Sequence, residues 1–282
     1  MRLHAVLVAA LAACVLTGCA TIPAPLPRKA IQLNEDGAAA LGAGETEVAE
    51  ARLALALEYN PRFTEAWVNL GLVELKKRNF DVAQKDFARA HELNPDLPAP
   101  LHAMGILAEV RGRADVAAKR YRDALAVDPG FGASRANLGR LLFASGAIEQ
   151  AREQFLRLTE VAPEHVEGFA GLVECYWKLG RDTEATDVLS VALRAFGEVP
   201  ALALLHARQV LREGQLDEAQ AQLTSLTTSE DGRFHAPAWA WLSVARMAAG
   251  DGAGAERAAR EALARNAEEP VARYVLAQLS AR

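Results

Sequence analysis

Several features that are common in enzymes are missing from this 282-residue chain. Its six histidines are scattered, and no two of them form an HExxH or other i, i+4 pair that would hold a metal ion. The glycine-rich stretch 250–254 (GDGAG) lacks the preceding strand and the Lys-Ser/Thr ending of a phosphate-binding loop. These absences argue against a metal or cofactor site and against an enzyme.

The chain also lacks an excess of basic residues. It carries 31 Lys and Arg against 36 Asp and Glu, a net charge of −5. Nucleic-acid binding needs a concentrated basic surface, so nucleic acid is excluded as a partner. Aromatic residues make up 6% of the chain, while apolar residues with abundant alanine make up about half. This composition fits close-packed helices better than a β-rich barrel.

Proline, by contrast, recurs with a fixed spacing. Pro61, Pro95, Pro129 and Pro163 follow one another at intervals of 34 residues. A period of a few tens of residues indicates stacked supersecondary units, none of which buries its apolar face alone. Each unit has room for two short antiparallel helices with a turn between them.

Other residues recur in the same frame. In the unit that starts at residue 64 the recurring slots hold Trp67, Leu70, Gly71, Ala83, Phe87, Ala90 and Pro95. The units from 98 and 132 repeat this pattern closely, and those from 30 and 166 repeat it more weakly. Gly214 and Gly250 place two more units, the last after a two-residue insertion in the polar run 227–232. Small residues such as Gly71 and Ala83 predict points where two helices approach closely.

This pattern of Trp, Leu-Gly, Ala, an aromatic residue, Ala and Pro resembles that of tetratricopeptide repeat proteins. The resemblance implies an all-α fold: a right-handed superhelical α-solenoid of about seven helix pairs with a C-terminal capping helix. The implied repeats are 30–63, 64–97, 98–131, 132–165, 166–199, 200–235 and 236–269, and the capping helix is 270–282.

The amino terminus carries a second signal. Its apolar run, 5–15, is too short to span a bilayer, so residues 1–18 are predicted to be a signal peptide. The following Leu-Thr-Gly-Cys quartet, which ends at Cys19, resembles the lipobox of bacterial lipoproteins. The resemblance implies cleavage before Cys19 and a covalent lipid on its sulfur, with no other cofactor. Residues 19–29 then form a Pro-rich tether. The alternative is an ordinary secretory signal with an incidental cysteine.

Two further expectations depend on the lipobox. With Cys14 removed and Cys19 acylated, only Cys175 stays free, so the mature chain has no internal disulfide, and a buried, inert thiol is expected at Cys175. Ala20 follows the lipidated position, so the rule by which Asp there retains lipoproteins at the inner membrane does not apply. We therefore expect an outer-membrane lipoprotein facing the periplasm, with the inner membrane as the alternative.

The resemblance also implies a binding surface, because in this family the first helix of each pair lines a concave groove. The candidate partner-binding residues carried over in this way are Asn69, Leu72, His102, Ile106, Asn137, Arg140, Phe143, Glu174, Trp177, Arg208 and Trp241. Relatives that grip a terminal carboxylate use Lys at the fifth position, where this chain has Val68, His102, Ala136 and Ala170. An apolar strand or an amphipathic helix is therefore the expected guest. Some of these apolar residues could instead pack against neighbouring repeats.

Three functions remain open from the sequence. The favoured one is a non-catalytic, membrane-anchored scaffold that mediates protein–protein interactions in assembly of an envelope machine. Tetratricopeptide lipoproteins of this class include pilotins of type IV pilus secretins and lipoproteins of gliding motility, so the expected partners are a secretin or motility-complex components. The alternatives are a periplasmic chaperone or adaptor for peptidoglycan or outer-membrane protein assembly, and a module that holds a partner enzyme. The sequence leaves the oligomeric state open.

Overall fold

The computed structural model describes residues 27–281. The predicted signal peptide 1–18, the predicted lipidation site Cys19 and most of the predicted tether 19–29 lie outside the described residues. The last two tether residues, 28 and 29, belong to the first helix. The described chain divides into two compact units, of which unit 1 ends at Asn94 and unit 2 begins at Pro95.

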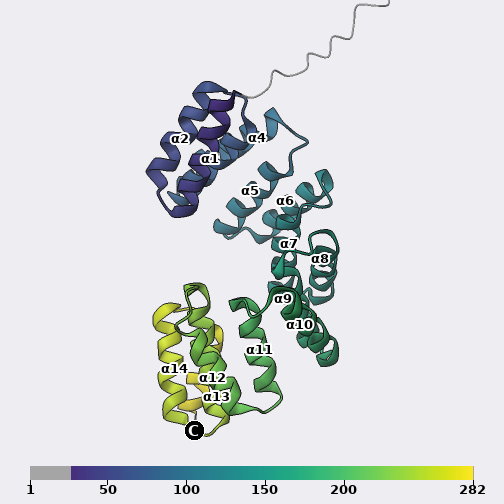
Figure 1. The fold of residues 1–282 in the computed structure, drawn as a ribbon, viewed down its shortest axis with the longest axis vertical. Helices are drawn as coiled ribbons and strands as arrows, with labels where there is room; N and C mark the ends of the chain where they lie inside the picture. Colours follow the sequence, from purple (N-terminus) through teal and green to yellow (C-terminus); the bar gives the residue numbers. More distant parts are fainter. Residues whose placement is uncertain (1–26, 282) are drawn as a thin grey trace, which may run out of the picture. The chain divides into compact units, whose positions relative to one another are not determined.

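The described residues form helices and no strands, arranged as consecutive pairs (Figure 1). Unit 1 contains α1 (Arg28–Ala43), α2 (Thr46–Tyr59), α3 (Thr64–Lys76) and α4 (Phe80–Leu93). Unit 2 contains α5 (Pro98–Val110), α6 (Ala114–Val127), α7 (Gly132–Ala144), α8 (Ile148–Val161), α9 (Val166–Lys178), α10 (Asp182–Phe196), α11 (Pro200–Arg212), α12 (Leu216–Leu226), the 3-10 turn η1 (Gly232–Phe234), α13 (His235–Ala248), α14 (Gly252–Arg265) and α15 (Pro270–Ser280). The predicted all-α repeat fold is confirmed.

The turn inside most pairs depends on one glycine. Gly112, Gly146, Gly180, Gly214 and Gly250 all have φ between 69° and 83°, in the left-handed region that glycine adopts without a steric penalty. In the pair α3–α4 the same place is occupied by Arg78, with φ 65°. A side chain in this conformation strains the backbone.

Glycines within the first helices allow the paired helices to approach. A Cβ added at Gly71 would lie 2.4 Å from the ring of Phe87, and one added at Gly105 would lie 2.4 Å from the ring of Tyr121. Both rings are completely buried. The prediction that Gly71 marks a close helix contact is therefore confirmed.

The core of unit 2 continues from one pair to the next. One buried cluster draws Ala108 from α5, Tyr121 from α6, Leu138 from α7, Phe155 from α8 and Leu172 from α9. Each pair therefore buries its apolar face against its neighbours in sequence, as expected of a repeat fold.

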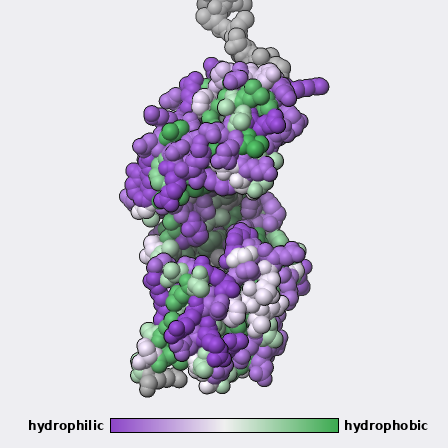
Figure 2. Space-filling view, turned by 90° about the vertical axis from the view of Figure 1, so that its left-hand side faces the viewer, coloured by the Kyte–Doolittle hydropathy of each residue, from purple (hydrophilic) through white to green (hydrophobic). Residues whose placement is uncertain are grey.

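The face of the molecule in Figure 2 is mostly hydrophilic, with small apolar areas between the polar ones. Large apolar side chains that are exposed, such as Val110 and Tyr274, are spread over different helices. Within residues 27–281, no helix is both long enough and apolar enough to cross a membrane.

Candidate functional site

In unit 1 the two predicted groove residues lie on α3. Asn69 donates a hydrogen bond from Nδ2 to Oδ1 of Asn34 on α1, over 2.9 Å. Leu72 is half-buried. The Asn69 amide is thus engaged in linking two first helices, although it keeps further hydrogen-bonding capacity for a guest.

In unit 2, His102 is a half-buried member of a side-chain cluster. Its Nδ1 lies 3.0 Å from Oγ of Ser134, and its ring centre lies 5.4 Å from the ring centres of both Tyr121 and Phe131. Burial lowers the pKa of His102 to about 4, against an opposing effect of Glu109. Ile106, on the next turn of α5, packs against the core cluster of unit 2.

Asn137 and Arg140 are joined through two residues that the sequence argument did not select. The Tyr121 hydroxyl and Arg140 both donate to the Glu109 carboxylate, each over 2.5 Å, and Asn137 Nδ2 donates to the Tyr121 hydroxyl over 3.2 Å. Burial and the neighbouring Glu109 raise the pKa of Tyr121. Glu109 stands at the twelfth position of its repeat, the position that the predicted groove residues Phe143 and Trp177 occupy in theirs, so the repeat frame contained the signal for it.

A second cluster brings together four predicted residues from three helices. Arg208 on α11 forms a two-pronged ion pair with Glu174 on α9, with one of the two contacts at 3.0 Å. Its guanidinium carbon lies 4.8 Å from the ring centre of Trp177 and 4.4 Å from that of Trp241 on α13. Because Trp177 is only 9% exposed, its ring is mainly packed within the protein.

Between α7, α9 and α11 lies a cavity of about 450 Å³. Its lining residues are Ala136, Asn137, Arg140, Phe143, Phe155, Glu167, Ala170, Gly171, Glu174, Ala201, Leu204, Leu205, Arg208 and Phe234, all within unit 2. Five of these were predicted as groove residues. His102, Ile106, Trp177 and Trp241 are not among the lining residues, and Asn69 and Leu72 belong to unit 1.

The cavity exists because three small residues, Ala136, Ala170 and Gly171, line it where larger side chains would fill the space. A Cβ at Gly171 would lie 2.5 Å from the Phe155 ring, so that ring packs directly on the α9 backbone. The sequence held a signal for this cavity, because small residues occupied the fifth position in two consecutive repeats.

The charged side chains around the cavity are not equivalent. Arg140 pairs with Glu109, and Arg208 pairs with Glu174. Glu167, with a side chain 61% exposed, has an ion-pair contact with the imidazole of His165, at 3.7 Å. Glu167 is therefore the lining charge that, among the described residues, has no Arg or Lys within ion-pair distance.

The remaining residues of interest are the free cysteine, the tryptophan at the start of the second repeat and possible metal ligands. Cys175 is buried, as expected, and desolvation raises the pKa of its thiol to about 12. Trp67, at the fourth position of its repeat, donates from Nε1 to the Pro61 carbonyl over 2.9 Å. Within residues 27–281, no group of three or more His, Cys, Asp and Glu side chains is placed to hold a metal ion.

Comparison with protein families agrees with this architecture. Residues 64–97 and residues 111–168 each match a tetratricopeptide repeat model. The chain thus contains stretches that match tetratricopeptide repeats. No curated protein matches its sequence.

Several solved structures share the fold. A tetratricopeptide repeat protein from Parabacteroides merdae is 17% identical, with a TM-score of 0.66, over 91% of this chain and 100% of that chain. PilF from Pseudomonas aeruginosa is 19% identical, with a TM-score of 0.59, over 76% of this chain and 97% of that chain. A chain of the APC/C hetero-tetramer Cut9–Hcn1 is 16% identical, with a TM-score of 0.58, over 90% of this chain and 43% of that chain. At these identities the likeness concerns the fold.

Proposed function

We propose that this protein is a non-catalytic scaffold whose unit 2 groove binds a segment of a partner protein. The observation that carries the proposal is the apolar cavity on the groove side of α7, α9 and α11. Concave apolar sites with a few polar groups at the edge are typical binding sites. A bulky side chain of an extended or helical guest would fill such a space and anchor the guest.

The state of the groove's titratable groups supports binding rather than catalysis. His102 is kept neutral by burial, and the Cys175 thiol is buried with a raised pKa, so neither is poised near pH 7. Glu109 and Glu174 are engaged by arginines. Side chains held in this way shape a surface and give it polarity.

We further propose that a lipid on Cys19 anchors the protein at the outer membrane, facing the periplasm. The support is the lipobox-like quartet that ends at Cys19 and the absence of Asp at residue 20. Several acyl chains bind lipid far more firmly than one, since each buried methylene contributes about 0.8 kcal/mol. The inner membrane is the alternative location.

Replacing the proposed lipidation site tests the anchor. We expect Cys19→Ala to abolish incorporation of labelled palmitate and to move the protein into the soluble fraction, because the only proposed lipid attachment is lost. Cys175→Ala is the matched control and should leave both labelling and fractionation unchanged, since that thiol is buried. A Cys19→Ala protein that stayed in the membrane fraction would contradict the anchor.

The proposed setting is an envelope machine such as a type IV pilus or a gliding-motility complex, with a secretin or motility-complex component as partner. The fold likeness to PilF supports testing the pilus first. A photo-crosslinking residue at position 167, beside the cavity, tests this in cells. The control variant carries the same photo-crosslinking residue in place of Lys119, which is exposed on α6.

Position 167 should capture one dominant partner that position 119 does not. A secretin or a motility component supports the proposed setting. A peptidoglycan enzyme or an outer-membrane assembly factor would instead favour the chaperone, adaptor or enzyme-holding roles. Equal capture from both positions would reject the groove as the binding surface.

A further inference from the structure

The segment between α12 and α13 contributes to the cavity in a way that the repeat pattern does not. We call residues 227–234 the strap; it contains the insertion that breaks the 34-residue period. The Ser229 hydroxyl donates to the Leu226 carbonyl over 3.1 Å, and His235 Nε2 lies 2.7 Å from the Ser229 carbonyl oxygen. Asp231 Oδ1 accepts a hydrogen bond from the Arg233 backbone N–H over 3.1 Å. The strap therefore has a defined conformation, set by its own side chains.

The strap ends with Phe234, which forms part of the cavity wall. Phe234 also packs against the cluster that contains Leu204, Leu226 and Leu242. One face of this residue is thus supported by the core, while the residue also borders the empty space. An aromatic side chain in this place can make an extended apolar contact with a guest.

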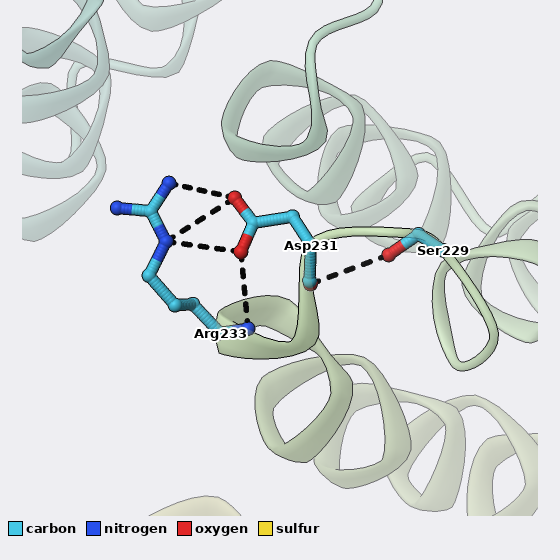
Figure 3. A network of polar contacts seen from close by, with 3 residues as sticks. All are labelled: Ser229, Asp231 and Arg233. Atoms are coloured by element: carbon cyan, nitrogen blue, oxygen red, sulfur yellow. Dashed lines mark hydrogen bonds and ion pairs between the residues drawn. The ribbon is translucent and has the colours of Figure 1, made fainter. Parts of the chain in front are cut away.

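Next to Phe234, Arg233 forms an ion pair with Asp231 of the strap, which we call the clamp. Figure 3 shows the Arg233 guanidinium folded onto the Asp231 carboxylate. Nε lies 2.9 Å from Oδ1 and Nη2 lies 2.6 Å from Oδ2. Asp231 raises the pKa of Arg233 most strongly, and the charge of Glu167 also raises it. The charge of Glu167 therefore acts on Arg233, but the ion pair of Arg233 is formed with Asp231.

This clamp leaves the carboxylate of Glu167 open at the edge of the cavity. Its side chain is 61% exposed, and its ion-pair contact is with His165 at 3.7 Å. The two arginines that line the cavity are already paired with Glu109 and Glu174. An apolar cavity beside one open carboxylate is complementary to an apolar side chain that is flanked by a positive charge.

We propose that the strap makes this cavity selective for a partner segment that inserts one bulky apolar side chain against Phe234 and places a Lys or Arg against Glu167. The inference rests on the proposed peptide-binding role of the groove and names the chemistry of its guest. The net charge of −5 agrees with it, since an acidic protein attracts a basic segment over a distance.

Peptide selection tests the guest chemistry directly. Phage-displayed random 12-residue peptides are selected on immobilised full-length protein, after depletion on an Ala170→Trp variant whose cavity is filled. We expect the enriched peptides to share a Phe, Trp, Leu or Met with a Lys or Arg a few residues away. The strongest peptide is then synthesised with a fluorophore, and its dissociation constant is measured.

Variants of the open carboxylate give the charge part of the test. Glu167→Gln should weaken binding of that peptide about 5-fold or more, the scale of one exposed but well-placed ion pair. Replacing its Lys or Arg with Gln should remove this difference. The matched control is Glu164→Gln, because Glu164 contacts the same imidazole at 3.8 Å but is not a lining residue.

The clamp is tested by Asp231→Asn, which keeps a side-chain oxygen for the Arg233 N–H but removes the charge that holds the guanidinium. Freed Arg233 should then pair with Glu167 and weaken the peptide about 5-fold. The double variant Asp231→Asn/Arg233→Gln should restore binding, and Phe234→Ala should weaken it through loss of apolar contact. Circular dichroism checks that each variant is folded.

The outcomes separate the two proposals. If no peptide distinguishes the protein from the Ala170→Trp variant, peptide binding by the groove and the selectivity both fail. If peptides are enriched without the apolar and basic pattern, or if the Glu167, Asp231 and Phe234 variants bind as the unchanged protein does, the groove binds peptides but the strap selectivity is overturned. Enrichment of acidic flanks would also overturn it.

Discussion

Two stretches of unit 2, α5–α8 and α11–α12, differ in the side chains that occupy the same repeat positions. In α5–α6 and α7–α8 an aromatic ring of the second helix packs on a glycine of the first, as Tyr121 does on Gly105. In α11–α12 the fourth and seventh positions hold Ala203 and His206 in place of the Leu101 and Met104 of α5. A cavity of about 500 Å³ lies beside Ala203 and His206. The divergent pair therefore borders open space at positions that larger apolar side chains occupy in α5.

The groove side shows the same contrast. Between α5 and α7 the polar side chains are linked by hydrogen bonds through Glu109 and Tyr121. From α9 to α13 they are held by Arg208, which is stacked between Trp177 and Trp241. We expect interior packing to contribute most of the stability where the repeat signature is kept, and groove-side contacts to contribute more where it lapses. Four perturbations test this difference, and we order them by expected effect.

The largest effect is expected from filling a regular helix contact. Gly71→Leu should lower the free energy of unfolding by about 3 kcal/mol or more, because even its Cβ would lie 2.4 Å from the Phe87 ring. The measurement is chemical denaturation followed by circular dichroism. Gly42→Leu is the control, since nothing lies within 4 Å of the added Cβ there. Equal stability of the two variants would refute close packing in the regular pairs.

In the divergent stretch the sensitive residue should be Arg208. Arg208→Ala should cost about 2 to 3 kcal/mol, because it removes two cation–π contacts and leaves Glu174 without its partner. Arg140→Ala, which removes an ion pair whose arginine side chain is 58% exposed, should cost less than about 1 kcal/mol. If the two arginines contributed equally in thermal unfolding, the contrast between the stretches would fail.

Acid should weaken the regular pairs through His102. Burial lowers the pKa of this imidazole from 6.5 to about 4, so the unfolded chain takes up a proton first as the pH falls. Stability should therefore decrease between pH 6.5 and pH 4, by up to about 3 kcal/mol in total. Measuring unfolding against pH for the protein and for His102→Phe isolates this contribution as their difference.

The difference is needed because Asp86, in unit 1, acts in the opposite direction. Burial, reinforced by the charge of Glu74, raises the pKa of Asp86 to about 6. Protonation of Asp86 therefore favours the folded state as the pH falls from about 6 to 3.8. An identical pH dependence in the protein and in His102→Phe would show that the imidazole is not held neutral by the fold.

The smallest effect is expected at the strained turn of unit 1. Arg78→Gly should raise the stability by about 0.5 kcal/mol, because glycine relieves the left-handed strain but adds freedom to the unfolded chain. The reverse change in a regular turn, Gly112→Arg, should be destabilising. A loss of stability in Arg78→Gly would mean that the 5.7 Å contact of Arg78 with the Phe80 ring outweighs the strain.

Much of the fold could be predicted because it repeats. Pro61, Pro95, Pro129 and Pro163 fix the 34-residue period, so a helix assigned to the wrong residues in one repeat would disagree with the other repeats. The groove was less accessible. The repeat frame identified Asn137, Arg140, Phe143, Glu174 and Arg208, which do line the cavity, but whether they bind a partner stays a prediction. It could not identify Phe234, because this residue lies in an insertion that has no counterpart in the other repeats.

By itself the sequence determined the all-helical repeat, its period and the glycines at close contacts, because local helix patterning and side-chain size recur every 34 residues. Only the tertiary structure decided which inward residues enclose space and which are consumed by packing. Trp177 and Trp241 stack on Arg208, whereas Ala136, Ala170 and Gly171 leave a cavity. The physical reason is that a cavity depends on how side chains from several helices pack together. The sequence of a single repeat does not specify this packing.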